Sequence, residues 1–318
     1  MNAEGHGLPT KIIIDADAGI GDALAIICAL IAPSIEVVGV TATAGTVPGV
    51  QATRNVQAII GLLDPPLRPR IGGCSEQPLD DSATPQQKLI NGQCGLGEFI
   101  APDIDLHNRR DSAKLIVDLV RDAPGEVTIL TLGPLTNIAR AFELFPELPE
   151  MIRGIVCLGG SVNAGGDVTA IAEFNIWAAR IAARTVFRSP ASKTLVPLDV
   201  SRRVVLTPQE VSAIKPVPSE MADVVESMLQ FFLRAHRQHL GIEGIRLDAV
   251  AALASIAGPD LFESRPMSVD VETSGELTRG MTVFDRRDTP NWRANIDVLT
   301  GIDYLGVADY FMQVIRRV

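Results

Sequence analysis

Short apolar runs alternate with helical stretches along this chain, and this alternation limits the folds that it can adopt. The runs with the length and composition of buried strands are Lys11–Ile14, Ile35–Val40, Val127–Leu132, Gly154–Leu158 and Thr194–Val196. Helical stretches such as Thr53–Leu62 and Ala113–Arg121 separate them. Strands separated by helices pair in parallel through right-handed crossovers. The sequence therefore predicts an α/β fold with a mainly parallel open sheet flanked by helices.

One domain is expected, because a parallel sheet covered on both faces can hold 318 residues around one core. No repeat or shift in composition marks a boundary, so we predict a single domain over residues 1–318, with a flexible N-terminus at residues 1–9. Pro, Gly and polar residues accumulate from Asp64 to Asn108, which predicts a long loop region.

The last third of the chain has two further patterns. Pro218–Ala257 is predicted to be helical. Ser268–Val271 and Gly280–Phe284 are predicted to form a late pair of strands.

The charge balance and the cysteine pattern exclude several classes of protein. The net charge is -10 and the isoelectric point is near 4.9, without a run of Lys or Arg, so nucleic acid is not an expected partner. The four cysteines lack CxxC spacing, which fits neither a disulfide framework nor a zinc site. No apolar run approaches the length that spans a bilayer, and no targeting segment is recognisable. We therefore expect a cytoplasmic protein that does not bind membranes.

Three aspartates, Asp15, Asp17 and Asp22, lie close together at the end of the first predicted strand. Open α/β sheets bind their ligands beyond the carboxyl ends of the strands. Carboxylates this close repel one another unless a cation neutralises them, and oxygen ligands suit calcium or magnesium. The pattern predicts a metal site at this edge of the sheet. The alternative is that Asp15 and Asp22 cap the following helix and face solvent.

Two other classes of aspartate-rich site share part of this pattern. An EF-hand loop needs a further Asp or Asn before its glycine and a Glu at its twelfth position, where this chain has Ala18 and Ile26. A phosphatase with an aspartyl nucleophile also starts with paired aspartates after an apolar strand, but its usual downstream context is not recognisable here.

Three other segments could add ligands at the same edge. A Gly-Pro turn after Leu132 can expose a backbone carbonyl to a metal. Glu173 and Asn175, which follow the strand that ends in Gly159-Gly160, could hydrogen-bond the hydroxyls of a sugar. Asp248 places a carboxylate at the start of an apolar helix. The alternatives are an ordinary strand-to-helix turn, a solvated helix start and an N-cap.

Six short motifs follow one another over nearly the whole chain, at Asp15–Ala23, Gly133–Asn137, Gly159-Gly160, Ala172–Asn175, Asp248 and Gly280–Asp285. Taken in this order, they resemble the motifs of the inosine-uridine-preferring nucleoside hydrolase family. The resemblance implies an enzyme that hydrolyses the N-glycosidic bond of a ribonucleoside or a related ribosyl compound and gives ribose and free base. It also implies a homodimer or homotetramer.

The resemblance further implies a calcium ion held by Asp17, Asp22, the backbone carbonyl of Leu132 and Asp248. Asp17 would also be the catalytic general base, which deprotonates the attacking water. The bond to the base would break through an oxocarbenium-like state that the carboxylates stabilise.

The substrate-binding residues implied by the resemblance are Asp167, Glu173 and Asn175, of which Asp167 stands where the family usually has Asn. Asn91 and His236 are further candidates for contact with the substrate. His236 and His239 are one helical turn apart and could reach the base pocket. The alternative for both is a solvated helix face.

Four positions depart from the family pattern. The first carboxylate of the family's adjacent Asp pair is Gly21, so one contact to a ribose hydroxyl is missing. Thr46 stands where the family has an Asn, and Leu247 and Asn91 stand where it has two histidines. A general acid for the leaving base, which contributes about a hundredfold or more in rate, therefore has no obvious supplier. The alternative function is a catalytically weakened protein that holds calcium and binds a sugar or nucleoside.

Overall fold

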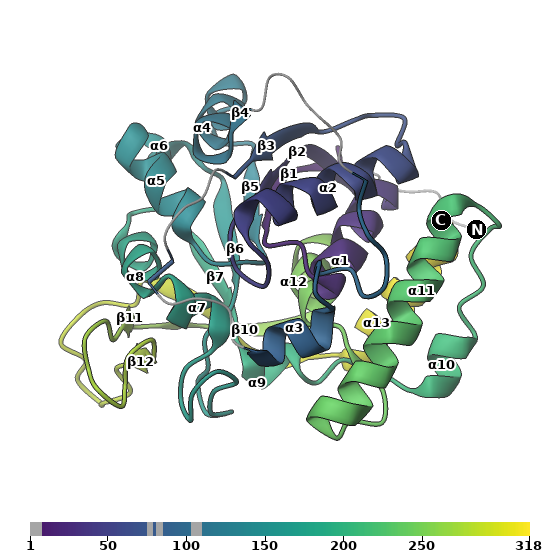
Figure 1. Ribbon diagram of the computed structural model, residues 1–318. Helices are drawn as coiled ribbons and strands as arrows, with labels where there is room; N and C mark the ends of the chain where they lie inside the picture. Colours follow the sequence, from purple (N-terminus) through teal and green to yellow (C-terminus); the bar gives the residue numbers. More distant parts are fainter. Residues whose placement is uncertain (1–7, 75–78, 81–84, 103–109) are drawn as a thin grey trace.

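A computed structural model describes residues 8–74, 79–80, 85–102 and 110–318 of the chain. Most of the predicted flexible N-terminus, residues 1–7, and part of the predicted loop region lie outside the described residues. The main sheet has nine strands in the order β10-β13-β7-β6-β5-β1-β2-β3-β4 (Figure 1). Neighbouring strands are parallel except for β10 and β13. The predicted single-domain α/β fold with a mainly parallel sheet is confirmed.

The strands of this sheet are β1 (Thr10–Ala16), β2 (Ile35–Ala42), β3 (Arg70–Gly73), β4 (Arg110–Asp111), β5 (Thr128–Thr131), β6 (Gly154–Leu158), β7 (Lys193–Val196), β10 (Phe262–Met267) and β13 (Ile296–Ile302). Two small antiparallel sheets pair β8 (Val205–Leu206) with β9 (Ile245–Arg246), and β11 (Val269–Val271) with β12 (Thr282–Phe284). The predicted late pair of strands is thus confirmed.

Helices cover both faces of the sheet (Figure 1). They are α1 (Ile20–Ile31), α2 (Gly49–Leu63), α3 (Pro85–Asn91), α4 (Ser112–Asp122), α5 (Thr136–Leu144), α6 (Leu148–Met151), α7 (Phe174–Ala178), α8 (Arg180–Arg188), α9 (Leu198–Ser201), α10 (Pro208–Ser212), α11 (Glu220–Ala235), α12 (Asp248–Ala257) and α13 (Tyr304–Ile315). A π-helical turn, η1 (His236–Leu240), continues α11, and a 3-10 turn, η2 (Pro259–Leu261), follows α12.

The central strand β1 explains why the sheet is buried on both faces. Side chains alternate between the two faces of a strand. Accordingly, Ile12 and Ile14 pack into the core that contains α1, α2 and α12, whereas Ile13 packs into the core under α4, α5 and α8. All three isoleucines are fully buried, so apolar side chains on both faces fix this strand in the middle of the molecule.

Two predictions about the fold were wrong in part. The predicted loop from Asp64 to Asn108 contains β3 and α3, because the Gly-rich β3 has a weak apolar signal and depends on pairing with β2. The predicted helical region up to Ala257 breaks after η1 at Gly241, whose φ is +67°, and β9 follows.

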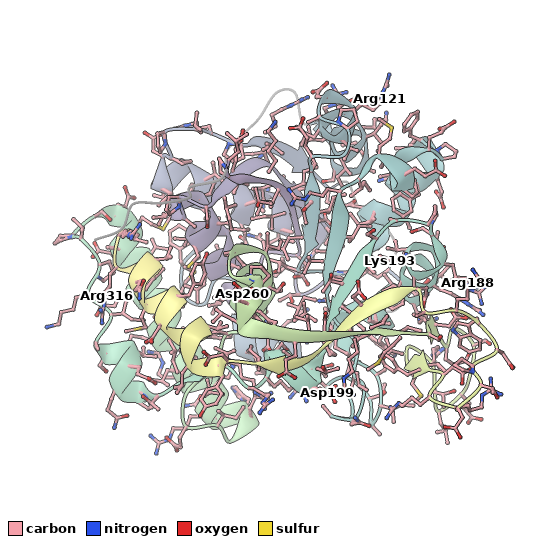
Figure 2. All side chains as sticks on the ribbon, turned by 180° about the vertical axis from the view of Figure 1, so that it is seen from behind. Arg121, Arg188, Lys193, Asp199, Asp260 and Arg316 are labelled. Carbon is pink, nitrogen blue, oxygen red and sulfur yellow. The ribbon has the colours of Figure 1, made fainter. Side chains whose placement is uncertain are left out.

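Strands β10 and β13 had no sequence prediction. Figure 2 shows this antiparallel pair beside α13 (yellow) on the back of the molecule. Glu263 and Arg265 of β10 are exposed charged residues, so the sequence of this edge strand lacks a clear apolar pattern. Within the described part of the chain, no helix combines the length and apolar character needed to cross a bilayer.

Candidate active site

The first aspartate, Asp15, lies fully buried in β1. Its Oδ1 accepts hydrogen bonds from Thr41 Oγ1 at 2.6 Å and from Asn137 Nδ2 at 2.8 Å. Burial raises the pKa of Asp15 to about 7, although these two hydrogen bonds lower it. Asp15 therefore ties β1 to β2 and to α5 beneath the site. The alternative prediction that it faces solvent was wrong.

Asp17 and Asp22 form a buried acidic pair at the carboxyl end of β1 and in the first turn of α1. Asp17 Oδ2 accepts a hydrogen bond from the backbone N–H of Thr46 at 2.5 Å. Asp22 Oδ2 accepts a weaker one, of 3.4 Å, from the N–H of Gly19. Burial and the adjacent Asp17 raise the pKa of Asp22 well above its usual range. Asp22 thus contributes to the helix cap, as the alternative predicted, but it does not face solvent.

Asp17 lies very close to the backbones of two glycines, Gly45 and Gly133. A Cβ at Gly45 would overlap the carboxylate of Asp17, and a Cβ at Gly133 would lie 2.9 Å from the Asp17 backbone nitrogen. Ala18, which follows Asp17, has a φ of +49°. The chain therefore turns sharply after Asp17, between two glycine-containing loops.

Leu132, which precedes the Gly-Pro turn after β5, lines the cavity described below. The backbone N–H of Leu132 donates to the carbonyl of Asp15 at 2.8 Å, and the carbonyl of Leu132 accepts from Asn175 Nδ2 at 2.8 Å. A carbonyl oxygen has a second lone pair, so Leu132 can accept one hydrogen bond and still bind a cation.

Glu173 is the N-cap residue of α7 and is buried. Its carboxylate accepts from the backbone N–H groups of Gly160 at 2.9 Å, Asn175 at 3.0 Å and Ile176 at 3.1 Å. Burial raises the pKa of Glu173 to about 8, and Asp167 adds to this, while the N–H donors oppose it. The predicted alternative of a solvated helix start was therefore wrong, because this helix start is buried against the strand end at Gly160.

Asp248 begins α12 as predicted, but it does not act as the N-cap, which is Leu247. Its Oδ1 accepts from Ser201 Oγ at 2.6 Å. Asp167 accepts from the N–H of Phe174 at 2.9 Å and lies 3.6 Å from Arg202 Nη2. Burial raises the pKa of Asp167 to about 6, although Arg202 opposes this rise.

Asn91, at the end of α3, is buried, and its side chain forms hydrogen bonds with backbone groups of α1 and α3. Its Oδ1 accepts from the N–H of Ile20 at 3.0 Å, and its Nδ2 donates to the carbonyl of Gln87 at 3.1 Å. Because the N-cap residue Gly19 has no side chain, Asn91 supplies the acceptor for the first turn of α1 from a distant part of the chain.

The two neighbouring histidines differ in burial. His236 is 2% exposed, and its ring packs edge-on against Phe232 at 4.2 Å between centroids. Its Nδ1 contacts the Phe232 carbonyl at 3.0 Å, so this nitrogen carries the proton. Burial lowers the pKa of His236, which keeps the imidazole neutral. The solvated face predicted as an alternative was wrong for His236 and correct for the exposed His239.

All nine residues predicted for the site line one cavity of about 380 Å³: Asp17, Asp22, Asn91, Leu132, Asp167, Glu173, Asn175, His236 and Asp248. A cavity of this size accepts a compound as large as a nucleoside. Sequence reasoning missed Ser201, Arg202, Phe232 and Arg246, which also line it. Arg202 lies beside no sequence feature that had drawn a functional prediction. Arg246 lies two residues before the predicted ligand Asp248, and this spacing was the one signal that could have found it.

The donors in this cavity fit a hard divalent cation. Asp17 and Asp22 form no ion pair with a described residue, so two adjoining buried carboxylates lack a compensating charge. Leu132 and Asp248 add oxygen donors. Within the described residues, no group of three or more His, Cys, Asp or Glu side chains gathers into a metal cluster. The acidic core is therefore a pair, to which a carbonyl and one further carboxylate can contribute.

The family profile described as "inosine-uridine preferring nucleoside hydrolase" matches residues 12–309. The chain belongs to this family. The predicted enzyme class is confirmed: this nucleoside hydrolase is an enzyme that hydrolyses ribonucleosides to ribose and base. The family match gives no support to the phosphatase alternative.

Relatives of this nucleoside hydrolase match it over nearly their whole length. A pyrimidine-specific ribonucleoside hydrolase, RihA, of Shewanella baltica is 34% identical, over 96% of each chain. Uridine nucleosidase 1 of Arabidopsis thaliana is 30% identical, over 97% of this chain and 94% of its own. The solved structure of a purine-preferring ribonucleoside hydrolase from Gardnerella vaginalis has a TM-score of 0.89 at 30% identity, and covers 96% of this chain and 98% of its own.

Of the four positions that depart from the predicted family pattern, Asn91 is described above, and the other three differ in whether they line the cavity of this nucleoside hydrolase. Gly21 lines the cavity, and a Cβ there would meet only Ala249 Cβ, at an ordinary 3.8 Å. Thr46 lines the cavity and orients Asp17 through its backbone. Leu247 is 1% exposed within the core and does not line the cavity. The Leu247 side chain therefore offers no proton donor to a substrate.

Proposed function

We propose that this nucleoside hydrolase depends on calcium and uses Asp17 as the general base in cleaving the N-glycosidic bond. The observation that carries the proposal is the buried, uncompensated pair of Asp17 and Asp22 in a cavity of about 380 Å³. Calcium would be held by Asp17, Asp22, Asp248 and the carbonyl of Leu132. When bound, it would supply positive charge that neutralises the carboxylates and lowers the pKa of a neighbouring water.

Asp17 is suited to take a proton from the attacking water. The backbone N–H of Thr46 holds the Oδ2 of Asp17 at 2.5 Å, and Oδ1 takes no part in this hydrogen bond. A general base fixed in this way contributes about 100-fold to 10,000-fold in rate. Because Gly45 and Gly133 have no Cβ, Asp17 can occupy this space close to their backbones.

Glu173, Asn175 and Asp167 would bind the sugar. Each of them is held by backbone groups of the loop after β6 or of the start of α7. When ionised, the carboxylates of the buried Glu173 and the half-buried Asp167 would stabilise the positive charge that develops on the ribose ring as the bond breaks.

The leaving base needs either a proton or an intrinsically stable anion. His236 is the only histidine among the described residues that line the cavity, and its neutral ring can accept a hydrogen bond through Nε2 from a base N–H. The base that this pocket prefers would then carry an N–H group, as uracil and hypoxanthine do.

A turnover assay with compounds of different leaving groups tests the proposal. The purified enzyme is incubated with uridine, inosine and nitrophenyl riboside, in calcium and in a chelator, and base release is followed. We expect calcium-dependent cleavage that falls by about 100-fold or more in Asp17→Asn. The matched control is Asp260→Asn, an exposed aspartate on the far side of the molecule (Figure 2).

The two candidate functions predict different results in this assay. Cleavage of nitrophenyl riboside without cleavage of nucleosides means that Asp17 functions and that leaving-group activation limits the reaction. Cleavage that is equal with and without calcium contradicts the proposed cofactor. Tight calcium binding without cleavage of any compound favours the alternative, a weakened binding protein.

A further inference from the structure

Two arginine side chains line the same cavity as the acidic residues. Arg202 follows α9, and its guanidinium lies 3.6 Å from Asp167. Arg246 belongs to β9, two residues before Asp248, and is half-buried. Both side chains come from segments beside the start of α12, so the positive charge is concentrated at one part of the cavity wall.

Arg246 is not explained by charge balance alone. Within residues 8–74, 79–80, 85–102 and 110–318, no hydrogen bond or ion pair satisfies its guanidinium. The nearby carboxylate of Asp248 accepts from Ser201 at 2.6 Å instead, and that of Asp167 is closer to Arg202. A half-buried guanidinium has five donors, and leaving them without acceptors is costly.

We propose that Arg202 and Arg246 bind an anionic oxygen group, a phosphate or a carboxylate, that the substrate carries. This inference rests on the proposed function, since it assigns a substrate class to the same cavity. The planar guanidinium fork of arginine matches the paired oxygens of either group in a bidentate contact. With a neutral nucleoside, Arg246 has only the longer-range attraction of Asp248 and Asp167, whereas an anionic group contacts its guanidinium directly.

The acidic residues of the cavity do not prevent this binding. Asp17 lies at the end of β1 and Asp22 in α1, and both would be neutralised by a cation, while the carboxylate of Glu173 already accepts from three backbone N–H groups. Asp167 and Asp248 lie beside the arginines, but Asp167 pairs with Arg202 and Asp248 accepts from Ser201. The segment of wall that carries Arg202 and Arg246 is thus the one where an anion meets positive charge. The anionic group can come from the sugar, as a 5′-phosphate, or from the base, as a carboxylate.

Three substrates that share one pyrimidine ring separate these sources at constant ionic strength. Uridine is neutral, uridine 5′-monophosphate carries the charge on the sugar, and orotidine carries a carboxylate on the base. We expect kcat/KM to exceed that of uridine by about tenfold or more for one of the two charged compounds. Arg246→Gln should remove most of this preference, and Arg246→Lys should keep part of it, because lysine retains charge but loses the fork.

The matched control is Arg265→Ala, an exposed arginine on the edge strand β10, which should keep the ratio of the wild type. Equal kcat/KM values for the three compounds, or an unchanged ratio in both Arg246 variants, would overturn the inference. In that case the arginines serve only to offset Asp167 and Asp248.

A binding measurement separates failure of this inference from failure of the proposed function. Calorimetric titration compares ribose 5-phosphate with ribose, and orotate with uracil, in the wild type and in Arg246→Gln. Selective binding of one anion that Arg246→Gln weakens, without turnover of any nucleoside, supports the inference while the proposed function fails. Turnover of uridine without selective binding of either anion has the opposite meaning.

Discussion

The space around Gly21 is large enough for a side chain at this position. This residue stands where the family has a carboxylate, yet the backbone is ordinary and a side chain would meet only Ala249. Asp22, the next residue, is already buried beside Asp17. The cavity therefore has room for the missing contact to a ribose hydroxyl.

We predict that Gly21→Asp folds and raises kcat/KM for uridine by about tenfold, the value of one hydrogen bond to a charged group. The gain should be smaller for 2′-deoxyuridine if the new carboxylate binds the 2′-hydroxyl. Kinetics on both compounds measure it. Gly45→Ala is the contrasting variant, because its Cβ overlaps the carboxylate of Asp17 and should abolish activity. Equal gains on both compounds would contradict the assigned contact.

Asn91 shows a second effect at the scale of one residue. Its Oδ1 satisfies the N–H of Ile20 in a buried setting, at a distance of 71 positions in sequence. Asn91→Ala leaves this N–H without an acceptor, and we expect the free energy of unfolding to fall by about 1–2 kcal/mol. Denaturant titration measures it, with the exposed Gln93→Ala as control. An unchanged unfolding free energy would mean that another acceptor replaces Asn91.

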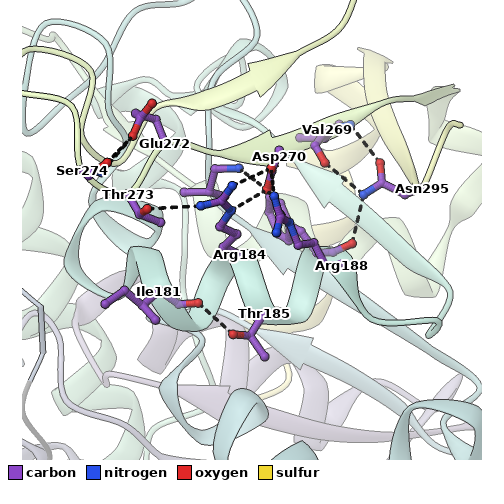
Figure 3. A network of polar contacts seen from close by, with 12 residues as sticks. Ile181, Arg184, Thr185, Arg188, Val269, Asp270, Glu272, Thr273, Ser274 and Asn295 are labelled. Carbon is purple, nitrogen blue, oxygen red and sulfur yellow. Dashed lines mark hydrogen bonds and ion pairs between the residues drawn. The ribbon is translucent and has the colours of Figure 1, made fainter. Parts of the chain in front are cut away.

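At the scale of elements, the β11–β12 hairpin is attached to α8 by charge. Figure 3 shows Asp270 of β11 between Arg184 and Arg188 of α8. Its carboxylate accepts from Arg188 Nη2 at 2.6 Å and from Arg184 Nη2 at 3.3 Å. Partial burial raises the pKa of Asp270, but the hydrogen bond from Arg188 and the other donors outweigh it and lower the pKa below its usual range.

A depressed folded-state pKa contributes stability that is present above the unfolded pKa and lost as the pH falls through the folded value. We therefore predict that Asp270→Asn is less stable than the wild type at pH 7 by about 1 kcal/mol, since the pair is partly exposed. The difference should shrink as the pH falls below the ordinary pKa of aspartate and vanish once the folded carboxylate is protonated. Thermal unfolding across this range measures it. A difference that persists at low pH would show that packing, and not charge, attaches the hairpin.

At the scale of the whole molecule, the acidic pair links cation binding to stability. We expect calcium at 100 times its dissociation constant to add about 2.7 kcal/mol, which raises the melting temperature by on the order of 5 °C. Asp22→Asn should remove this response. In a chelator the same variant should melt above the wild type, because it loses the repulsion from Asp17.

The melting curves of Asp260→Asn provide the control for this experiment, since that exposed side chain lies outside the cavity. Its response to calcium should equal that of the wild type. A calcium response that survives in Asp22→Asn would place the cation elsewhere in the molecule.

The sequence alone was sufficient to predict the central strands of the sheet, β1, β2, β5, β6 and β7, and the edge at which the site lies. Local apolar runs such as Ile12–Ile14 predict buried strands. The carboxyl ends of parallel strands lie at one edge of the sheet. Asp17, Asp22 and the later carboxylates were therefore expected to meet, and Asp17, Asp22, Glu173 and Asp248 line one cavity. The motifs Gly133–Asn137 and Gly280–Asp285 do not line it.

The surroundings of these residues follow from the tertiary structure and not from local sequence. The role of Asn91, the burial of His236 and the position of Arg246 depend on contacts between segments that are far apart in the chain or on the π-helical turn after α11. Likewise, the edge strand β10 carries exposed charges and forms a strand because it pairs with β13. Burial and pairing of this kind arise from packing between distant segments, which local sequence patterns do not encode.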